Sequence, residues 1–222
     1  MTSGKVIDDC IVDDVSDEVL KRKLPMCTDV RVELVMGNAL AMYQRKGADV
    51  VELYSQPRIA QEAAVRKYGN TELVAGWSLD LTMRDPETNM PWDLSKPETQ
   101  KKVRKMVVET KPFMLIGSPP CTAFSQLQGL NKDRRDPAIV AREMADACAH
   151  IAFCFEMCNI QRKANRYFAH EHPSSASSWN RPEVLAMLLQ EEVELVEEDM
   201  CHFGMVASDK YGEALVRKRT KV

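Results

Sequence analysis

The sequence lacks any long uninterrupted hydrophobic run, and no apolar stretch approaches the ~18 residues that a membrane-spanning helix requires. The N-terminal stretch MTSGKVIDDCIVDD has acidic residues where a secretory leader would have a basic segment followed by an apolar one. These two absences predict an intracellular protein without a membrane partner. In such a compartment the seven cysteines are expected to remain reduced thiols, and their odd number agrees with that expectation.

The sequence also has no surplus of basic residues, since its formal net charge is −3. A domain that coats duplex DNA is usually clearly basic, so any contact with nucleic acid must be local. Two basic clusters suit local contacts: Lys132 with Arg134 and Arg135, and the C-terminal Arg217, Lys218, Arg219 and Lys221. For the C-terminal cluster, a solvated and frayed tail is the favoured interpretation.

Internal repeats are absent as well, and a length of 222 residues suits one sizeable core with small appendages. Residues 1–28 are acidic without a clear period, and they are predicted to form a poorly ordered arm or a short helix. Residues 29–210 are predicted to form a single domain, and residues 211–222 a basic tail. A helical period over residues 30–46 predicts that the domain begins with an amphipathic helix.

Within this predicted domain, short apolar runs alternate with segments of helical period. The predicted strands are residues 49–54, 71–81, 113–117, 166–171 and 193–203, and the predicted helices are residues 58–68, 97–110, 137–164 and 180–190. This alternation predicts an α/β fold with a doubly wound, mostly parallel sheet and helices on both faces, as in Rossmann-like proteins.

Polar residues stand near the ends of the predicted strands, namely Glu52, Ser55, Asp80, Ser118, Cys121 and Glu171. Parallel α/β sheets bind ligands beyond the carboxyl ends of their strands, so these side chains are expected to converge on one cleft. The stretch Gly-Ser-Pro-Pro-Cys at residues 117–121 is especially informative. Two consecutive prolines end the strand, and a thiol follows directly.

The run Ser-Pro-Pro-Cys-Thr-Ala-Phe-Ser at residues 118–125 resembles the cytosine-C5 DNA methyltransferases when it is taken with the acidic strand ends and the later Glu171-His-Pro. The resemblance covers about residues 48–205. With Trp92-Asp and Cys201-His-Phe-Gly included, the chain looks most like divergent methyltransferase-like domains of phage and mobile elements. The resemblance implies a class I methyltransferase fold, S-adenosylmethionine as cofactor, and methylation of cytosine in DNA.

The resemblance also implies two catalytic residues. Cys121 is the expected nucleophile, because cytosine C5 becomes nucleophilic only after a thiolate adds to C6. Glu171 is expected to stabilise the charge that this addition moves toward N3, and its pKa would have to be raised by burial. Since the base must leave the stack to reach the thiol, the DNA partner is expected to present a flipped or single-stranded cytosine.

The remaining candidates fall into two groups. The expected cofactor-binding residues are Glu52, Ser55, Asp80, Asp93, Ser118 and Pro119. Within that group, Asp80 is expected to accept the ribose hydroxyls and Asp93 to lie near the adenine amino group. The expected nucleic-acid contacts are Phe124, Ser125, Lys132, Arg134 and Arg135, of which the basic residues would hold flanking phosphates.

Two other functions remain open. The Ser-Pro-Pro-Cys stretch is also similar to the Ser-Pro-Pro-Tyr loop of amino-methyltransferases, which bind an exocyclic amine without a nucleophile, and Phe124 could supply the aromatic ring. The other possibility is a catalytically inactive, methyltransferase-like binding domain of a larger polyprotein. The turn at residues 54–58 favours it, because that turn contains no glycine.

Several polar residues also have simpler structural interpretations. Glu52 could cap a helix. His170 and His172 are expected to pack or to cap, because strand alternation turns them away from Glu171. Cys154 and Cys158 share a helical face with His150 but lie among apolar residues, so a buried helix is expected there and no metal site.

Overall fold

The computed structural model describes residues 5–7, 10–13, 47–65 and 73–222. The chain forms two compact units, one of residues 45–195 and the other of its two ends, residues 1–44 and 196–221. These limits differ from the predicted boundaries after residues 28 and 210. The helix predicted over residues 30–46 lies outside the described residues.

A four-stranded parallel sheet forms the centre of the unit of residues 45–195. In spatial order its strands are β4 (Ala75–Leu79), β3 (Val50–Leu53), β5 (Met114–Gly117) and β6 (Tyr167–His170). All three pairings are parallel, and Leu53 is paired with Leu79 on one side and with Gly117 on the other. The predicted α/β class and parallel sheet are confirmed, and the arrangement is compatible with a Rossmann-like fold.

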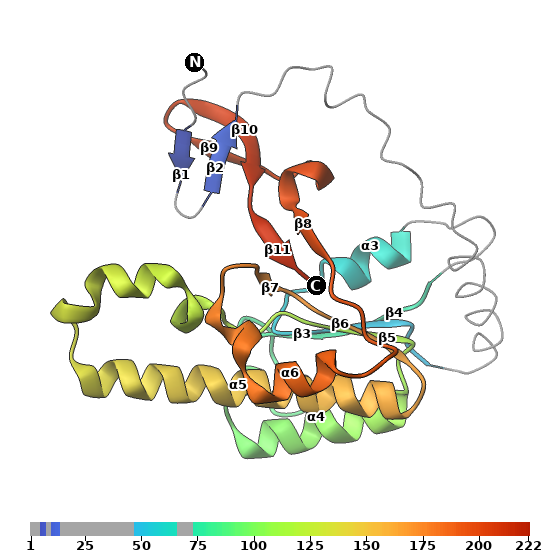
Figure 1. The fold of residues 1–222 in the computed structure, drawn as a ribbon. Helices are drawn as coiled ribbons and strands as arrows, with labels where there is room; N and C mark the ends of the chain where they lie inside the picture. The colour runs from blue at the N-terminus through green and yellow to red at the C-terminus, as the bar shows by residue number, and fades with distance from the viewer. Residues whose placement is uncertain (1–4, 8–9, 14–46, 66–72) are drawn as a thin grey trace. The chain divides into compact units, whose positions relative to one another are not determined.

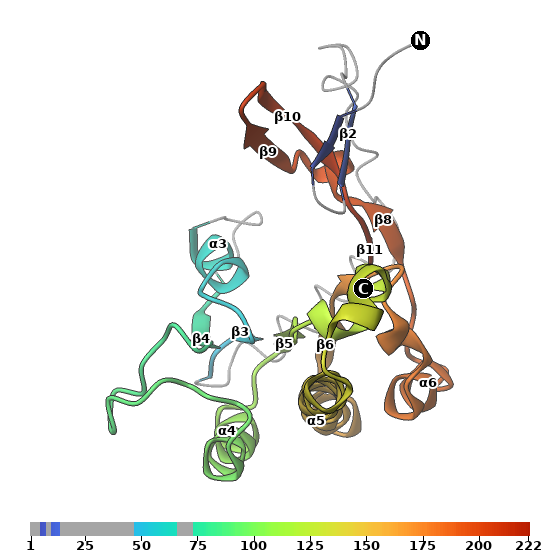
Figure 2. The ribbon, with the colours of Figure 1, turned by 90° about the vertical axis from the view of Figure 1, so that its left-hand side faces the viewer.

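Helices lie on both sides of this sheet (Figure 1). Helix α3 (Ile59–Val65) lies on one side, and α4 (Pro97–Thr110) and α5 (Pro137–Lys163) lie on the other (Figure 2). Helix α6 (Pro182–Leu188) packs against α5. None of the described helices combines the length and the apolar composition that crossing a membrane would need.

The two faces of the sheet bury different side chains, because successive residues of a strand point to opposite faces. Val50 packs with Ala60 of α3. Its neighbour Val51 belongs to the larger cluster on the opposite face, together with Leu115 and with Ile151 of α5. Strands covered on both faces are apolar along their whole length, which is why the sequence shows short continuous apolar runs here.

Local sequence sets the ends of the longer helices. The Asp136 carboxylate accepts a hydrogen bond from the Ala138 N–H at 2.8 Å, and Pro137 occupies the first turn of α5. Helix α4 also begins with a proline, and it ends at Lys111, whose φ of 46° is left-handed. The predicted limits of both helices are confirmed to within one residue.

Short elements connect the sheet to the later helices. The 3-10 helices η1 (Thr122–Phe124) and η2 (Gln126–Arg134) follow β5. A two-residue strand β7 (His172–Pro173) and the 3-10 helix η3 (Ser177–Asn180) follow β6.

The unit formed by the chain ends is antiparallel. Its elements are β1 (Lys5–Ile7), β2 (Cys10–Asp13), β8 (Glu197–Asp199), η4 (Met200–Phe203), β9 (Val206–Asp209), β10 (Gly212–Arg217) and β11 (Arg219–Lys221). One sheet has the order β1-β2-β10-β9, and β11 pairs with β8.

These strands correct two predictions. Residues 5–7 and 10–13 are strands where a poorly ordered arm or a short helix was expected. Arg217, Arg219 and Lys221 belong to paired strands where a frayed tail was expected. Arg217 and Arg219 bond to the buried Asp199 carboxylate at 3.2 and 3.0 Å, and these bonds, mainly the one from Arg219, lower the pKa of Asp199. Asp199 lies 18 residues before Arg217 and 20 before Arg219, so no local pattern reveals these pairs.

Candidate functional site

The carboxyl ends of the four parallel strands lie together at one edge of the sheet, as predicted. The residue that follows each of β3, β5 and β6 donates its backbone N–H to the last residue of a neighbouring strand. These residues are Tyr54, Ser118 and Glu171, and the N···O distances are 2.8, 3.2 and 3.1 Å. Asp80 directly follows β4. The four segments that carry the predicted polar residues therefore all begin at this carboxyl edge of the sheet.

The loop of residues 118–125, here called the Cys121 loop, leaves the carboxyl edge after β5. The half-buried Cys121 accepts a hydrogen bond at its carbonyl from the Phe124 N–H, at 2.9 Å. The carbonyl of the buried Pro119 accepts a hydrogen bond from His172 Nε2 at 2.8 Å. The Ser177 hydroxyl donates to the Phe124 carbonyl at 3.3 Å. The Cys121 loop is thereby tied to the segment that follows β6.

The two histidines beside Glu171 are buried, with exposed fractions of 5% for His170 and 1% for His172. The His170 ring meets Phe155 of α5 at a centroid distance of 4.6 Å, and its Nδ1 lies 3.7 Å from Cys154 Sγ. The prediction that both histidines pack or cap is confirmed.

Glu52 has a structural role at the start of α3. Its side chain is 1% exposed, and Oε1 accepts hydrogen bonds from the N–H groups of Arg58 at 3.0 Å and Ala60 at 2.9 Å. The Ser78 hydroxyl donates to the same oxygen at 3.3 Å. The carboxylate therefore caps the start of α3, in agreement with the capping interpretation of Glu52.

The turn after β3 contains a strained residue. Tyr54 has a φ of 61°, in the left-handed region that favours glycine. Its hydroxyl lies 3.2 Å from both the carbonyl and Nδ1 of His150, and burial raises the pKa of Tyr54 well above 10. Burial also lowers the pKa of His150. The next residue, Ser55, donates its hydroxyl to the Gln56 carbonyl at 2.8 Å.

Asp80 and Asp93 occupy equivalent local turns. Asp80 Oδ1 accepts hydrogen bonds from the N–H and the hydroxyl of Thr82 at 2.9 and 2.7 Å. Asp93 Oδ1 accepts the same pair from Ser95 at 3.0 and 2.6 Å, and the hydroxyl bond is the main cause of its lowered pKa. Asp residues favour such turns for structural reasons alone. These contacts use Oδ1 of each carboxylate.

A cavity of about 520 Å³ lies between the end of β4 and the start of α4. Leu81 and Met90 contribute apolar surface to it, and Lys102 lies with its Nζ 5.2 Å from the ring centroid of Trp92. Of the predicted cofactor residues, Asp93 lines this cavity. It combines apolar walls with a few charged groups, as small-molecule sites commonly do.

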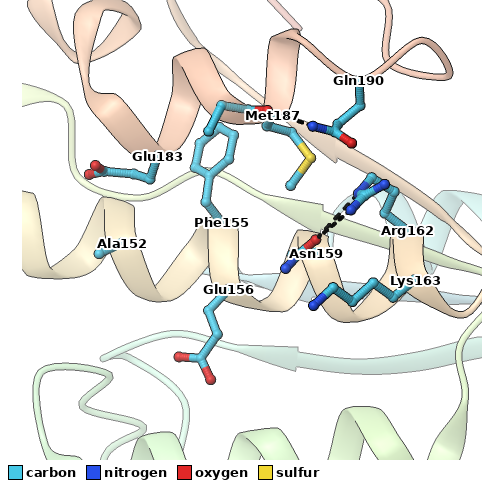
Figure 3. Close-up of a pocket in the computed structure, with 10 residues that line it drawn as sticks. Ala152, Phe155, Glu156, Asn159, Arg162, Lys163, Glu183, Met187 and Gln190 are labelled. Carbon is cyan, nitrogen blue, oxygen red and sulfur yellow. Dashed lines mark hydrogen bonds between the residues drawn. The ribbon is translucent and has the colours of Figure 1, made fainter.

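A second cavity, of about 490 Å³, lies between α5 and α6 (Figure 3). Phe155 and Met187 form its apolar part, and no predicted site residue lines it. Arg162 bonds to Asn159 Oδ1 at 3.2 Å and to Glu192 at 2.8 Å. Since much of the charge at this cavity is already paired within the protein, the structure gives no reason to place a ligand there.

Two predicted nucleic-acid contacts have partners inside the protein. Phe124 is 3% exposed and packs in the main core, so its ring is not available to a base. Arg135 donates to both carboxylate oxygens of Glu143 at 2.7 Å and to Gln128 at 2.8 Å. The expected roles of Phe124 and Arg135 in binding nucleic acid do not fit these contacts.

The other three predicted contacts lie in or beside η2. The Ser125 hydroxyl caps this helix by accepting a hydrogen bond from the Leu127 N–H at 3.2 Å. Arg134 is exposed at its end. Lys132 belongs to η2, but its side chain lies outside the described part of the structure.

Comparisons with known proteins found no match: no protein-family model, curated protein or solved structure is significantly similar to the chain. Within the described residues, no cluster of three or more His, Cys, Asp or Glu side chains is suited to holding a metal ion. The family resemblance therefore rests on the motifs in the sequence.

Proposed function

We propose that this protein transfers a methyl group from S-adenosylmethionine to C5 of cytosine in DNA, through a covalent adduct with Cys121. One observation supports this above all. The Cys121 loop follows β5, Glu171 follows β6, and these strands are parallel neighbours. The Glu171 N–H bonds to the Gly117 carbonyl at 3.1 Å. The segments that carry the Cys121 thiol and the Glu171 carboxyl group, 50 positions apart in the sequence, thus leave the sheet from the ends of two neighbouring strands.

The chemistry needs both groups. The Cys121 thiolate adds to C6 of the flipped cytosine, and the displaced electron pair makes C5 nucleophilic. The carboxyl group of Glu171 forms a hydrogen bond with N3 and stabilises the charge that develops there. Bound S-adenosylmethionine would supply the methyl group to C5 and would leave as the thioether S-adenosylhomocysteine. Transfer of the C5 proton to water then restores the C5–C6 double bond and expels the Cys121 thiolate, which leaves the enzyme unchanged.

The proposal includes a doubly wound, class I methyltransferase architecture. The strand order β4-β3-β5-β6 changes direction between β3 and β5, and α3 lies on the opposite side of the sheet from α4 and α5 (Figure 2). Ligands of such sheets bind at the carboxyl edge where the order changes.

The cofactor half of the site is proposed to use Asp80, Asp93 and Ser118. Asp80 follows β4 at the carboxyl edge, and Asp93 lines the cavity of about 520 Å³ whose walls include Leu81. An apolar wall with nearby carboxylates suits a flat, aminated ring and hydroxyl groups. When bound, S-adenosylmethionine would supply the electrophilic methyl group. Glu52 is left out of this set because α3 occupies its carboxylate.

The test uses an oligodeoxynucleotide that contains 5-fluorocytosine, in single-stranded and duplex form, with S-adenosylmethionine. Fluorine at C5 cannot leave as a proton does, so the covalent adduct persists. We expect an adduct whose peptide maps to Cys121. It should vanish in Cys121→Ser and persist in Cys148→Ser, which removes a half-buried thiol of α5. Absence of an adduct from a wild-type protein that binds the cofactor would overturn C5 methylation.

A second candidate is a catalytically inactive binding domain, which the turn at Tyr54 favours. A left-handed tyrosine with its side chain bonded to His150 fills a turn that would otherwise let a ligand approach the backbone. Calorimetric titration with S-adenosylmethionine decides between the two candidates, since no binding at millimolar concentration would leave only the inactive domain. The amino-methyltransferase alternative loses support because Phe124 is buried.

A further inference from the structure

We infer that His172 is a positioning residue that holds the Cys121 loop through the Pro119 carbonyl. The inference rests on the proposed function, since it adds a residue to the machinery of the same thiol. His172 Nε2 lies 2.8 Å from the Pro119 oxygen, and that carbonyl is two residues before Cys121. His172 itself directly follows Glu171. The His172 side chain thus links the segment that carries Glu171, after β6, to the Cys121 loop.

The direction of the hydrogen bonds follows from the partners. A carbonyl oxygen can only accept, so Nε2 carries the proton in the bond to Pro119. Nδ1 lies 2.7 Å from the hydroxyl oxygen of Ser178, which is 1% exposed. In a neutral ring, Nδ1 then accepts a hydrogen bond from the Ser178 hydroxyl, so that both contacts are satisfied. The two partners therefore select the tautomer with hydrogen on Nε2.

The composition of the loop explains why a side chain has to hold it. Pro119 and Pro120 have no backbone N–H, so the stretch between Ser118 and Cys121 cannot be held by its own donors. Carbonyl groups are what this stretch offers. Because Pro119 is buried, its carbonyl needs a donor from elsewhere, and His172 provides one.

The His172 ring is itself held in place by aromatic neighbours. Its centroid lies 4.9 Å from His170, 6.1 Å from Phe124 and 6.5 Å from Trp179. The Trp179 indole donates to the Pro173 carbonyl at 2.9 Å, which fixes that ring in turn. A positioning group works only if its own rotamer is locked, and this packing meets that condition.

The experiment compares two substitutions that each keep one of the two contacts. In His172→Gln the amide nitrogen stands as many bonds from Cα as Nε2 does, so the bond to Pro119 can form. In His172→Asn the amide reaches only as far as Nδ1, so Ser178 can still be contacted but Pro119 cannot. His202→Asn is the matched control, because it makes the same change at an exposed histidine of η4, whose Nδ1 lies 3.2 Å from Glu198 Oε2.

Two measurements are made on each variant: hydrogen exchange of the amides of residues 118–128 by mass spectrometry, and the rate of adduct formation with 5-fluorocytosine DNA. We expect faster loop exchange in His172→Asn and a rate lower by roughly 100-fold, since small misplacements at a reacting centre cost about that much. His172→Gln should restore most of both values, and His202→Asn should leave both near wild type.

Loop exchange in His172→Asn equal to wild type, or a Gln variant that behaves like the Asn variant, would overturn the inference. If the Asn variant does not fold, the Gln variant decides, because fast loop exchange in a folded Gln variant contradicts a role for the Nε2 donor. If the wild-type protein forms no adduct, the proposed function fails. The exchange comparison still tells whether His172 holds the loop.

Discussion

The two halves of the carboxyl edge use their polar residues differently. At the β3 and β4 half, the predicted acidic residues are engaged by nearby backbone and side-chain donors. Glu52 caps α3, and Asp80 and Asp93 each close a turn. At the β5 and β6 half, the bonds that shape the site run between the Cys121 loop and the segment after β6. The first half is organised locally, and the second by tertiary contacts.

This difference shows that an acid near a strand end is weak evidence of a ligand site. A carboxylate next to a helix start finds two free backbone N–H groups without any ligand, as Glu52 does. The Pro-Pro stretch has no such local donors, so its conformation depends on a partner from another strand. The β5 and β6 half, whose loop lacks hydrogen-bond donors nearby in the sequence, is therefore the better candidate for a catalytic site.

The largest effect on the free energy of unfolding is expected at Glu52. It tests whether Glu52, unlike Glu171, has a structural role. Glu52→Ala leaves two backbone N–H groups and a buried hydroxyl without an acceptor, so we expect a loss of about 3 kcal/mol in the free energy of unfolding. Glu52→Gln retains an oxygen and should lose about 1 kcal/mol. Urea unfolding at neutral pH measures both.

Glu171→Gln is the matched variant on the other half. We expect loss of adduct formation, together with a smaller loss in the free energy of unfolding than in Glu52→Ala, because the amide keeps the size and one oxygen of the carboxyl group. If Glu171→Gln unfolds as readily as Glu52→Ala, the two carboxylates are both structural and the contrast between the halves disappears.

A second, smaller effect concerns the packing beneath the Cys121 loop. A Cβ at Gly117 would overlap the sulfur of Cys154 on α5, so Gly117→Ala should destabilise the protein by about 2 kcal/mol through overpacking. Adding Cys154→Ala should recover part of that loss, because the overlapping atom is gone. Thermal unfolding of the two single variants and the double variant gives the coupling. Simple additivity would show that Gly117 and Cys154 do not meet.

The smallest expected effect is a pH dependence of the free energy of unfolding, caused by His150, which contacts Tyr54 after β3. Burial lowers the pKa of His150 below 6.5, although the nearby Asp93 and Asp146 oppose that shift. The unfolded chain therefore binds this proton at higher pH than the folded chain. The stability from the neutral ring is complete above pH 6.5 and is lost as pH falls through the folded pKa.

Urea unfolding at a series of pH values below neutrality measures this dependence. The free energy of unfolding should decline on acidification in the wild type, and it should decline less in His150→Gln. Equal slopes for the two proteins would mean that His150 contributes nothing to the acid sensitivity and that its contact with Tyr54 is not a determinant of stability.

Much of the central unit could be predicted because its signals are local. Pro97 and the Asp136-Pro137 pair are signals within a few consecutive residues, and the starts of α4 and α5 were predicted from them. The parallel sheet followed from alternating strands and helices. The strand predicted over residues 193–203 is shorter, because η4 begins directly after β8.

Other features could not be predicted, because their partners lie far away in the sequence. Phe124 carries no local mark of burial, and it is buried because the segment after β6 returns to cover it. The strands at the chain ends pair with each other across nearly the whole sequence.

The sequence by itself determined where the chain turns, which segments are apolar on both faces, and that a thiol follows a pair of prolines. Those properties arise from backbone dihedral limits and from hydrophobic periodicity, which act over a few residues. Only the tertiary structure decided which acid caps a helix and which histidine holds the Cys121 loop. A hydrogen bond forms with whatever donor the fold brings within about 3 Å, and that distance is unrelated to separation along the chain.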